Sequence, residues 1–155
     1  MSTEILTFGR QVLDQQAFSK LLGAQLDAFS PGHAELSLPV VPGLLQQHGF
    51  VHGGVLSYLA DNALTFAGGS VLGDSVTAEY KINYLRPVKD AERLVAVATV
   101  VGSGKTQAVC RCDVFIAARA RAHPVRCSTG DDSESGVRET TGAGKRSMDC
   151  GSGPQ

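Results

Sequence analysis

The stretch that decides the fold reads QQHGFVHGGVLSYLADNALTFAGG and covers residues 46–69. It is long and nearly uncharged, and its apolar side chains would cover most of the circumference of a helix. A helix that is apolar nearly all round is usually buried in a core. We therefore expect residues 53–67 to form a buried helix. Its polar exceptions Ser57, Asp61 and Thr65 recur at i, i+4 and i+8, so they form one narrow stripe.

The flanking segments predict an antiparallel sheet around this helix. Apolar and polar residues alternate in several segments, and turn signals such as Pro31-Gly32 separate neighbouring ones. A short amphipathic helix at residues 10–22 precedes them, with Gly23 as its C-cap. This order of elements favours an α+β fold with the sheet wrapped around one long buried helix. The expected strands are 24–30, 33–40, 75–85, 92–101 and 106–117.

The composition changes after about residue 117. The remaining chain has no aromatic residue and no aliphatic periodicity, and Gly, Ser, Thr and Arg dominate it. Such a segment buries too little apolar surface to offset its ordering entropy. We therefore expect a domain at residues 1–118 and an atypical, disordered tail at 119–155. No regular core strand is expected beyond about residue 125, although residues 117–126 could supply a poor substitute strand.

Composition and charge exclude several classes of protein. The net charge of the 155-residue chain is −1 and no basic stripe is visible, which argues against nucleic acid as a partner. We see no signal peptide and no apolar run of about 20 residues, so we expect no membrane partner and a cytoplasmic location. The four cysteines form no CxxC pair, so we expect core thiols, no metal site and no cofactor.

Asp61 is the first candidate catalytic residue. Its helical neighbours at i±3 and i±4 are Ser57, Tyr58, Leu64 and Thr65, and none of them is cationic. Burying a lone carboxylate is costly, and such groups concentrate at functional sites. The alternative is a carboxylate that is hydrogen-bonded to hydroxyls or that faces solvent.

The sequence His52-Gly53-Gly54 lies where a loop becomes the expected helix. Free N–H groups and the helix dipole give that end a partial positive charge, and glycine lets a ligand approach the backbone. Such an end can stabilise an oxyanion that develops on a carbonyl. The alternative is that the two glycines only permit tight packing of the helix on the sheet.

The spacing of these two candidates has a consequence for assembly. Gly53 and Asp61 are eight residues apart, which is about 12 Å along one helix. A reacting carbonyl needs both groups within about 3 Å, so one helix cannot supply both. Two antiparallel copies could supply them, and we therefore expect a homodimer with two equivalent composite sites.

These features resemble those of a known family. The stretch HGFVHGGVLSYLADNA, the later INYLRP and then GSGKT are similar to hotdog-fold acyl-CoA thioesterases of the phenylacetate-degradation, or PaaI-like, type. The resemblance covers about residues 20–116. It implies hydrolysis of an acyl-CoA thioester to a free acid and CoA, with no cofactor. It also implies protomers whose two sheets join, in a homodimer or a dimer of dimers.

The resemblance also implies roles for single residues. The family's helix acid falls on Asp61, its oxyanion-binding amide on Gly53 with Gly54 adjacent, and its strand hydroxyl on Thr77. A loop residue that is often Asn falls on Gln46, which has a longer reach. Further candidates for substrate contact are His52, which could instead orient the loop or be purely structural, and Asn62. Candidates for the CoA phosphates are Arg86, Lys81 and Lys89.

The C-terminus departs from the family's pattern. The family has one more strand after the equivalent of residue 116, and that strand lies inside the sheet. Its apolar alternation is missing here, so the final strand looks lost or altered, by truncation, a changed reading frame or an unusual extension.

Three functions remain open at this point. The leading one is an acyl-CoA thioesterase in which Asp61 acts as general base or as nucleophile. A second is a non-catalytic acyl-CoA-binding hotdog protein, impaired by its altered C-terminus. A third, a hotdog hydratase or dehydratase, is less favoured because no His–Asp pair is obvious before the helix.

Overall fold

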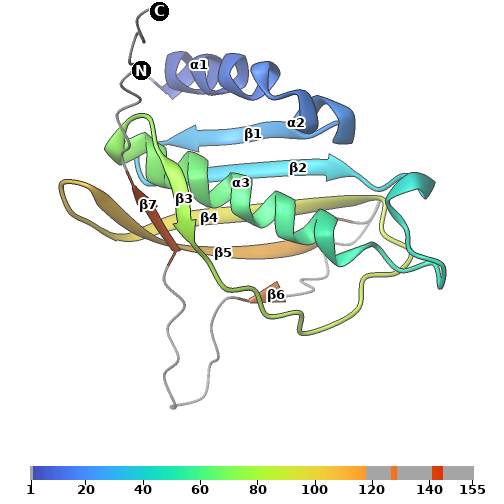
Figure 1. Cartoon of the computed structure of the whole chain (residues 1–155). Helices are drawn as coiled ribbons and strands as arrows, with labels where there is room; N and C mark the ends of the chain where they lie inside the picture. The colour runs from blue at the N-terminus through green and yellow to red at the C-terminus, as the bar shows by residue number, and fades with distance from the viewer. Residues whose placement is uncertain (1, 118–126, 129–140, 145–155) are drawn as a thin grey trace, which may run out of the picture.

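The computed structural model describes residues 2–117, 127–128 and 141–144. Over these ranges the chain forms helices at both the N-terminus and the centre, and strands on either side of the central helix (Figure 1). The helices are α1 (Ser2–Gln15), α2 (Ala17–Leu22) and α3 (Gly53–Leu72), with a 3-10 turn at Pro42–Leu44. The strands are β1 (Gln25–Ser30), β2 (His33–Pro39), β3 (Val76–Glu79), β4 (Arg93–Ser103), β5 (Gln107–Ala117), β6 (Cys127–Ser128) and β7 (Thr141–Gly144).

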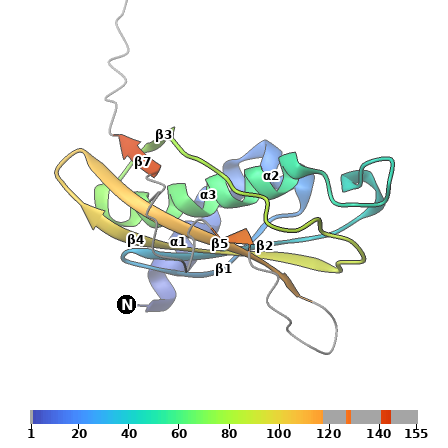
Figure 2. The same cartoon turned by 90° about the horizontal axis from the view of Figure 1, so that it is seen from below.

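The strands form one antiparallel sheet in the order β1-β2-β4-β5-β7-β3, and β6 pairs with β5 beside this path. The long pair β4–β5 is its centre, with Ala98 opposite Cys112 and Ala96 opposite Val114. The sheet curls around α3, so that β3 and β7 lie on the other side of the helix from β4 and β5 (Figure 2). This is the α+β architecture that the alternating segments predict, and the hairpin β1–β2 is confirmed.

Helix α3 is the core of the protein. Buried residues occupy nearly its whole circumference, and Leu59 and Ala63 have no exposed surface. The sheet opposes it with small side chains such as Ala96, Ala98 and Cys110, which allow the helix to approach closely. Each fully buried leucine stabilises the fold by about 1.5–3 kcal/mol. Burial also raises the pKa of the Cys110 thiol, which therefore stays neutral.

A layer formed by α1 and α2 covers one side of this core. Helix α1 packs on β1, and Gly9 makes the close approach possible, since a Cβ there would lie 2.6 Å from Leu26 Cδ2. At the junction of the two helices, Asn62 of α3 donates to Gln16 Oε1 at 3.0 Å, and Tyr58 donates to Ser19 Oγ at 2.6 Å. These hydrogen bonds fix the N-terminal layer to the central helix.

Three of the expected element bounds differ from the observed ones by more than two residues. The N-terminal helical region begins at Ser2 rather than at residue 10, and it divides into α1 and α2 at Gln16, whose backbone is extended. The central helix continues five residues further than expected, to Leu72. The strand expected at 75–85 ends at Glu79, because the chain turns away from the sheet there.

The expectation for the tail is wrong in one respect. Residues Thr141–Gly144 form β7, which lies inside the sheet between β5 and β3. Its backbone pairs Ala143 with Thr77 on one side and with Ala108 on the other. The residues of this strand, TGAG, show no apolar alternation, which is why a search for that pattern does not find the strand. The other expectations for residues 118–126, 129–140 and 145–155 lie outside the described residues.

Candidate active site

The carboxylate of Asp61 is held by a hydroxyl from the strand that follows its helix. Thr77 Oγ1 of β3 donates to Asp61 Oδ1 at 2.7 Å, and both residues are partly buried. The sheet's curl produces this contact, since it returns β3 to the polar stripe of α3 (Figure 2). Asp61 is thus bonded to a hydroxyl, as one alternative from the sequence proposed, and Oδ2 has no partner among the described residues.

Thr65 extends this contact by one helical turn. Its Oγ1 lies 2.8 Å from Thr77 Oγ1 and donates to the main-chain oxygen of Asp61 at 2.9 Å. A threonine hydroxyl has a single proton. While Thr77 gives its proton to the carboxylate, the single proton of Thr65 is shared between two acceptors, the main-chain oxygen of Asp61 and Thr77 Oγ1. Asp61, Thr65 and Thr77 therefore form one hydrogen-bonded cluster.

Ser57 continues the stripe in the other direction. Its Oγ is hydrogen-bonded to the hydroxyl of Tyr80, which follows β3. Each polar residue of the predicted stripe therefore meets a hydroxyl from residues 77–80. The side of α3 that faces this segment is polar, although the rest of the helix is buried in apolar surroundings.

At the N-terminus of α3, the N–H of Gly53 has no acceptor among the described residues. His52 is the N-cap, and its Nδ1 accepts from the N–H of Gly54 at 2.9 Å, so this ring nitrogen carries no proton. The first N–H of a helix has no acceptor within the helix, and none of the described residues accepts from Gly53. Gly53 therefore presents its N–H, whereas that of Gly54 is already used.

A pocket of about 360 Å³ opens at this end of α3. Gln46, Tyr84 and Arg86 line it together with Gly53 and Gly54. The Tyr84 hydroxyl donates to the carbonyl oxygen of Gly53 at 3.0 Å, which holds the segment after β3 against the helix N-terminus. The structure thus brings four of the sequence-derived candidates into one pocket.

The two halves of the candidate site lie apart in a single chain. Both Gly53 and Asp61 belong to α3, and eight residues correspond to about 12 Å along the axis. Asp61, Thr77 and Thr65 do not line the pocket at Gln46. No carbonyl group can therefore contact the Gly53 N–H and the Asp61 carboxylate of the same protomer.

Asn62 lies in neither the Gly53 part nor the Asp61 part of the candidate site. Its side chain is buried on the α1–α2 side of the helix, where its amide nitrogen lies within hydrogen-bond distance of Gln16, Ser19 and Tyr58 and can donate its two protons to two of them. These contacts engage the amide in holding two elements together. In the described residues Asn62 thus joins α3 to the N-terminal helices, and its assignment to substrate contact stays a prediction.

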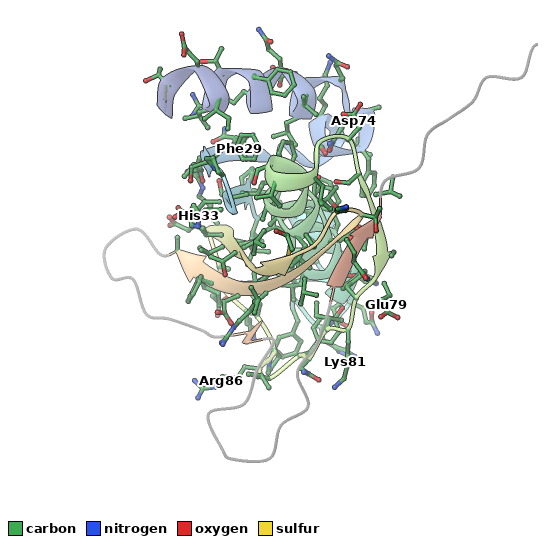
Figure 3. The ribbon with its side chains drawn as sticks, turned by 90° about the vertical axis from the view of Figure 1, so that its left-hand side faces the viewer. Phe29, His33, Asp74, Glu79, Lys81 and Arg86 are labelled. Carbon is green, nitrogen blue, oxygen red and sulfur yellow. The ribbon has the colours of Figure 1, made fainter. Side chains whose placement is uncertain are left out.

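The cations proposed for the CoA phosphates lie outside the Asp61 cluster. Arg86 is exposed at the edge of the pocket beside Gly53, and Lys89 Nζ lies 5.7 Å from the centroid of the Phe50 ring. Figure 3 shows Lys81 and Arg86 on the opposite side of the molecule from Phe29 and Asp74.

Two residues of the site were missed from the sequence. Thr65 carried a signal, because it lies at i+4 from Asp61 on the polar stripe. Tyr84 carried none, since its contact with Gly53 joins residues 31 positions apart through a segment without regular structure.

Comparison with known proteins identifies the family of the chain. The family model described as "Thioesterase superfamily" matches residues 48–122. The acyl-coenzyme A thioesterase PaaI of Escherichia coli is 32% identical over 96 residues, which are 62% of this chain and 69% of that protein. A crystal structure of a thioesterase family protein from Silicibacter pomeroyi matches with a TM-score of 0.72 and 28% identity, covering 86% of this chain and 91% of that one.

The structure of the Escherichia coli PaaI protein gives a TM-score of 0.74 and covers 94% of each chain. Its structural alignment has 24% identity, so this likeness shows the fold. An antiparallel sheet curled around one buried helix is the hotdog fold. The chain belongs to the thioesterase superfamily, and it is a PaaI-like thioester hydrolase. None of the described helices combines the length and apolar character needed to cross a membrane.

Proposed function

We propose that the protein hydrolyses an acyl-CoA thioester to the free acid and CoA. The observation that carries this proposal is the Asp61 carboxylate, the one acid on a mostly apolar helix, held through Oδ1 by Thr77. A carboxylate in this setting can take a proton from water while the oxygen attacks the thioester carbonyl. The C–S bond then breaks, and the CoA thiolate leaves and is protonated.

A second route uses the same residues. The carboxylate of Asp61 attacks the carbonyl itself and forms a mixed anhydride, which water then hydrolyses. In both routes negative charge develops on the carbonyl oxygen, and a preorganised N–H donor stabilises it. Gly53 of a second protomer is that donor, because the N–H in the same chain is too far from Asp61.

The proposal therefore includes a homodimer with two shared sites. Strand β3 is the last of the described strands in the sheet, and none of the described residues pairs with its outer edge, so that edge can pair with a copy of itself. Val76, Tyr84 and Leu85, on β3 and the segment after it, are each more than half exposed although they are large and apolar. Pairing across this edge would bury them and would set the two α3 helices side by side. Two such dimers could associate further.

The CoA part of the substrate is assigned to the pocket at the N-terminus of α3. Gln46 and Arg86 are exposed around it, and Arg86 can pair with a phosphate. His52 acts there as the helix cap that orients the loop. The buried thiol of Cys110, which forms no disulfide, is consistent with a reducing compartment, and we propose the cytoplasm.

A panel of acyl-CoA substrates with free-thiol detection tests this function. The intact chain should release CoA, and Asp61→Asn should lower kcat by at least about 100-fold, as expected for loss of a positioned base. Asp14→Asn replaces an exposed acid on α1 that lies away from the Asp61 cluster; it is the matched control and should leave kcat unchanged. Near wild-type turnover by Asp61→Asn would exclude the assignment. Binding of acyl-CoA without turnover would instead favour the non-catalytic acyl-CoA-binding protein.

A further inference from the structure

A second cavity lies on the other side of Asp61, toward the C-terminal end of α3. Its volume is about 310 Å³, and its lining is mostly apolar. Phe8 and Val12 of α1 form one wall. Phe29 of β1 and Phe66 of α3 form another, and Gly69 also lines the cavity, where it has no side chain to fill the space. Figure 3 shows Phe29 on this side of the molecule, away from Arg86.

Thr65 connects this cavity to the candidate catalytic residues. Its side chain lines the cavity, and its hydroxyl contacts both Thr77 and the main-chain oxygen of Asp61. One helical turn, about 5.4 Å, separates Thr65 from Asp61. A substrate whose carbonyl carbon lies beside Asp61 would therefore extend its acyl group past Thr65 into the cavity.

We propose that this cavity holds the acyl group of the substrate and that it selects uncharged acyl groups of about eight to ten carbons. This inference rests on the proposed acyl-CoA thioesterase function. A methylene group occupies about as much space as a water molecule, which takes roughly 30 Å³. A cavity of about 310 Å³ thus accommodates roughly ten such groups.

The walls of the cavity explain the selection. The rings of Phe29 and Phe66 meet edge to face, with centroids 5.6 Å apart and an interplanar angle of 90°, and both side chains are buried. This rigid wall favours hydrocarbon over polar groups. Asp74 is the ionisable residue among those that line the cavity. Its charge and the apolar wall both disfavour an acyl group that carries a carboxylate, such as succinyl.

The two pockets also divide the substrate between protomers. The acyl cavity belongs to the protomer that supplies Asp61, because Thr65 links them directly. The pocket beside Gly53 lies at the opposite end of the same helix and therefore serves the neighbouring site. In the shared site one chain binds the acyl group and its partner binds the CoA.

Gly69 offers the first test. A Cβ at this position would lie 3.3 Å from Ser75 Oγ, so a side chain can be added with a small adjustment of that hydroxyl. The four carbons of a leucine side chain would occupy roughly 120 Å³ of the cavity. Gly69→Leu should therefore shorten the preferred acyl chain by about four carbons and lower kcat/KM for octanoyl-CoA by about tenfold or more. Acetyl-CoA hydrolysis should be nearly unchanged.

The control is Val71→Leu, which places a leucine on an exposed position of the same helix. It should leave the chain-length profile unchanged. The substrates are acetyl-, butyryl-, octanoyl-, 4-phenylbutyryl-, dodecanoyl- and succinyl-CoA, and melting temperatures verify that each variant is folded. The intact chain should prefer octanoyl- and 4-phenylbutyryl-CoA, and succinyl-CoA should be a poor substrate.

Phe8 offers a second test that leaves the core intact. Its side chain is 62% exposed at the rim of the cavity, and Phe18 on α2 is comparably exposed, at 56%, without lining it. Phe8→Ala should extend the profile toward dodecanoyl-CoA, whereas Phe18→Ala should not. If neither Gly69→Leu nor Phe8→Ala alters the profile of an active, folded enzyme, the acyl group binds elsewhere and the proposal is overturned.

Calorimetry separates this proposal from the proposed function. Octanoyl-CoA and CoA are titrated into Asp61→Asn, which should not consume the ligand. Octanoyl-CoA should bind at least about tenfold more tightly than CoA, and Gly69→Leu in the same background should abolish the difference. If the intact chain hydrolyses no acyl-CoA but this difference is found, the hydrolytic function fails and the acyl cavity stands. Equal affinity of the two ligands for Asp61→Asn would contradict the cavity even in an active enzyme.

Discussion

Thr77 Oγ1 donates to Asp61 Oδ1 at 2.7 Å, although the two residues belong to different elements and lie 16 positions apart. The contact fixes the orientation of the carboxylate and leaves Oδ2 for a water molecule or a carbonyl carbon. Thr65 contacts Thr77 in turn, and the hydroxyl oxygens of the two threonines lie 2.8 Å apart. We therefore regard Thr77 as the residue that positions Asp61.

Replacement of Thr77 tests this relationship. Thr77→Ala removes the hydroxyl and should lower kcat roughly tenfold to hundredfold, because the carboxylate loses its fixed orientation. Thr77→Ser keeps the hydroxyl and should retain most of the activity. Steady-state kinetics on octanoyl-CoA, with melting temperatures as the control for folding, measure both. A serine variant as inactive as the alanine variant would show that the hydroxyl is not what matters.

Proline at residue 53 tests the oxyanion donor. Gly53 is the first residue of α3, where proline is tolerated, and His52 before it has the extended backbone that proline requires. Gly53→Pro therefore removes the N–H without breaking the helix, and should lower kcat by about 100-fold or more. Gly53→Ala is the control that keeps the N–H, and its Cβ would lie at an ordinary 3.4 Å from Tyr84 Cζ. Equal activity of the two variants would exclude the Gly53 amide.

Truncation tests the role of β7. Among the described strands, β3 pairs only with β7, and Thr77 lies opposite Ala143. A chain that ends at residue 126 should therefore have a lower melting temperature and a kcat reduced like that of Thr77→Ala. A chain that ends at residue 146 keeps β7 and should behave as the full chain does. If the shorter chain is equally stable and active, the domain ends near residue 118, as the composition alone suggests.

The central helix, the hairpin and the polar stripe could be predicted from the sequence because local periodicity determines them. Leu59 and Ala63 are buried, and Asp61 lies between them on a stripe that meets β3. Strand β7 could not be predicted, because its residues Thr141–Gly144 carry no apolar alternation and depend on the free edges of β3 and β5. A strand that forms because the folded chain offers it two sheet edges leaves no local pattern in the sequence.

The residues of the candidate site divide in the same way, into those that have a local signal in the sequence and those that do not. Asp61 and Gly53 were recognised because a lone acid on an apolar helix and a glycine at its start are local signals. The contacts of Asn62 with Gln16 and Ser19 could not be predicted, since the sequence does not show which side of the helix α1 and α2 will cover. Tyr84 was missed because a loop side chain finds its partner only in the folded chain.

The central claim is that one site uses Asp61 of one protomer and Gly53 of another. Mixed dimers of Asp61→Asn and Gly53→Pro chains, isolated with two different affinity tags, test it most directly. Each mixed dimer would contain one site with both residues intact and one site with neither, so about half the activity of the wild-type dimer should return. Each variant alone should remain nearly inactive. Mixed dimers that form and stay as inactive as their parents would contradict the shared site.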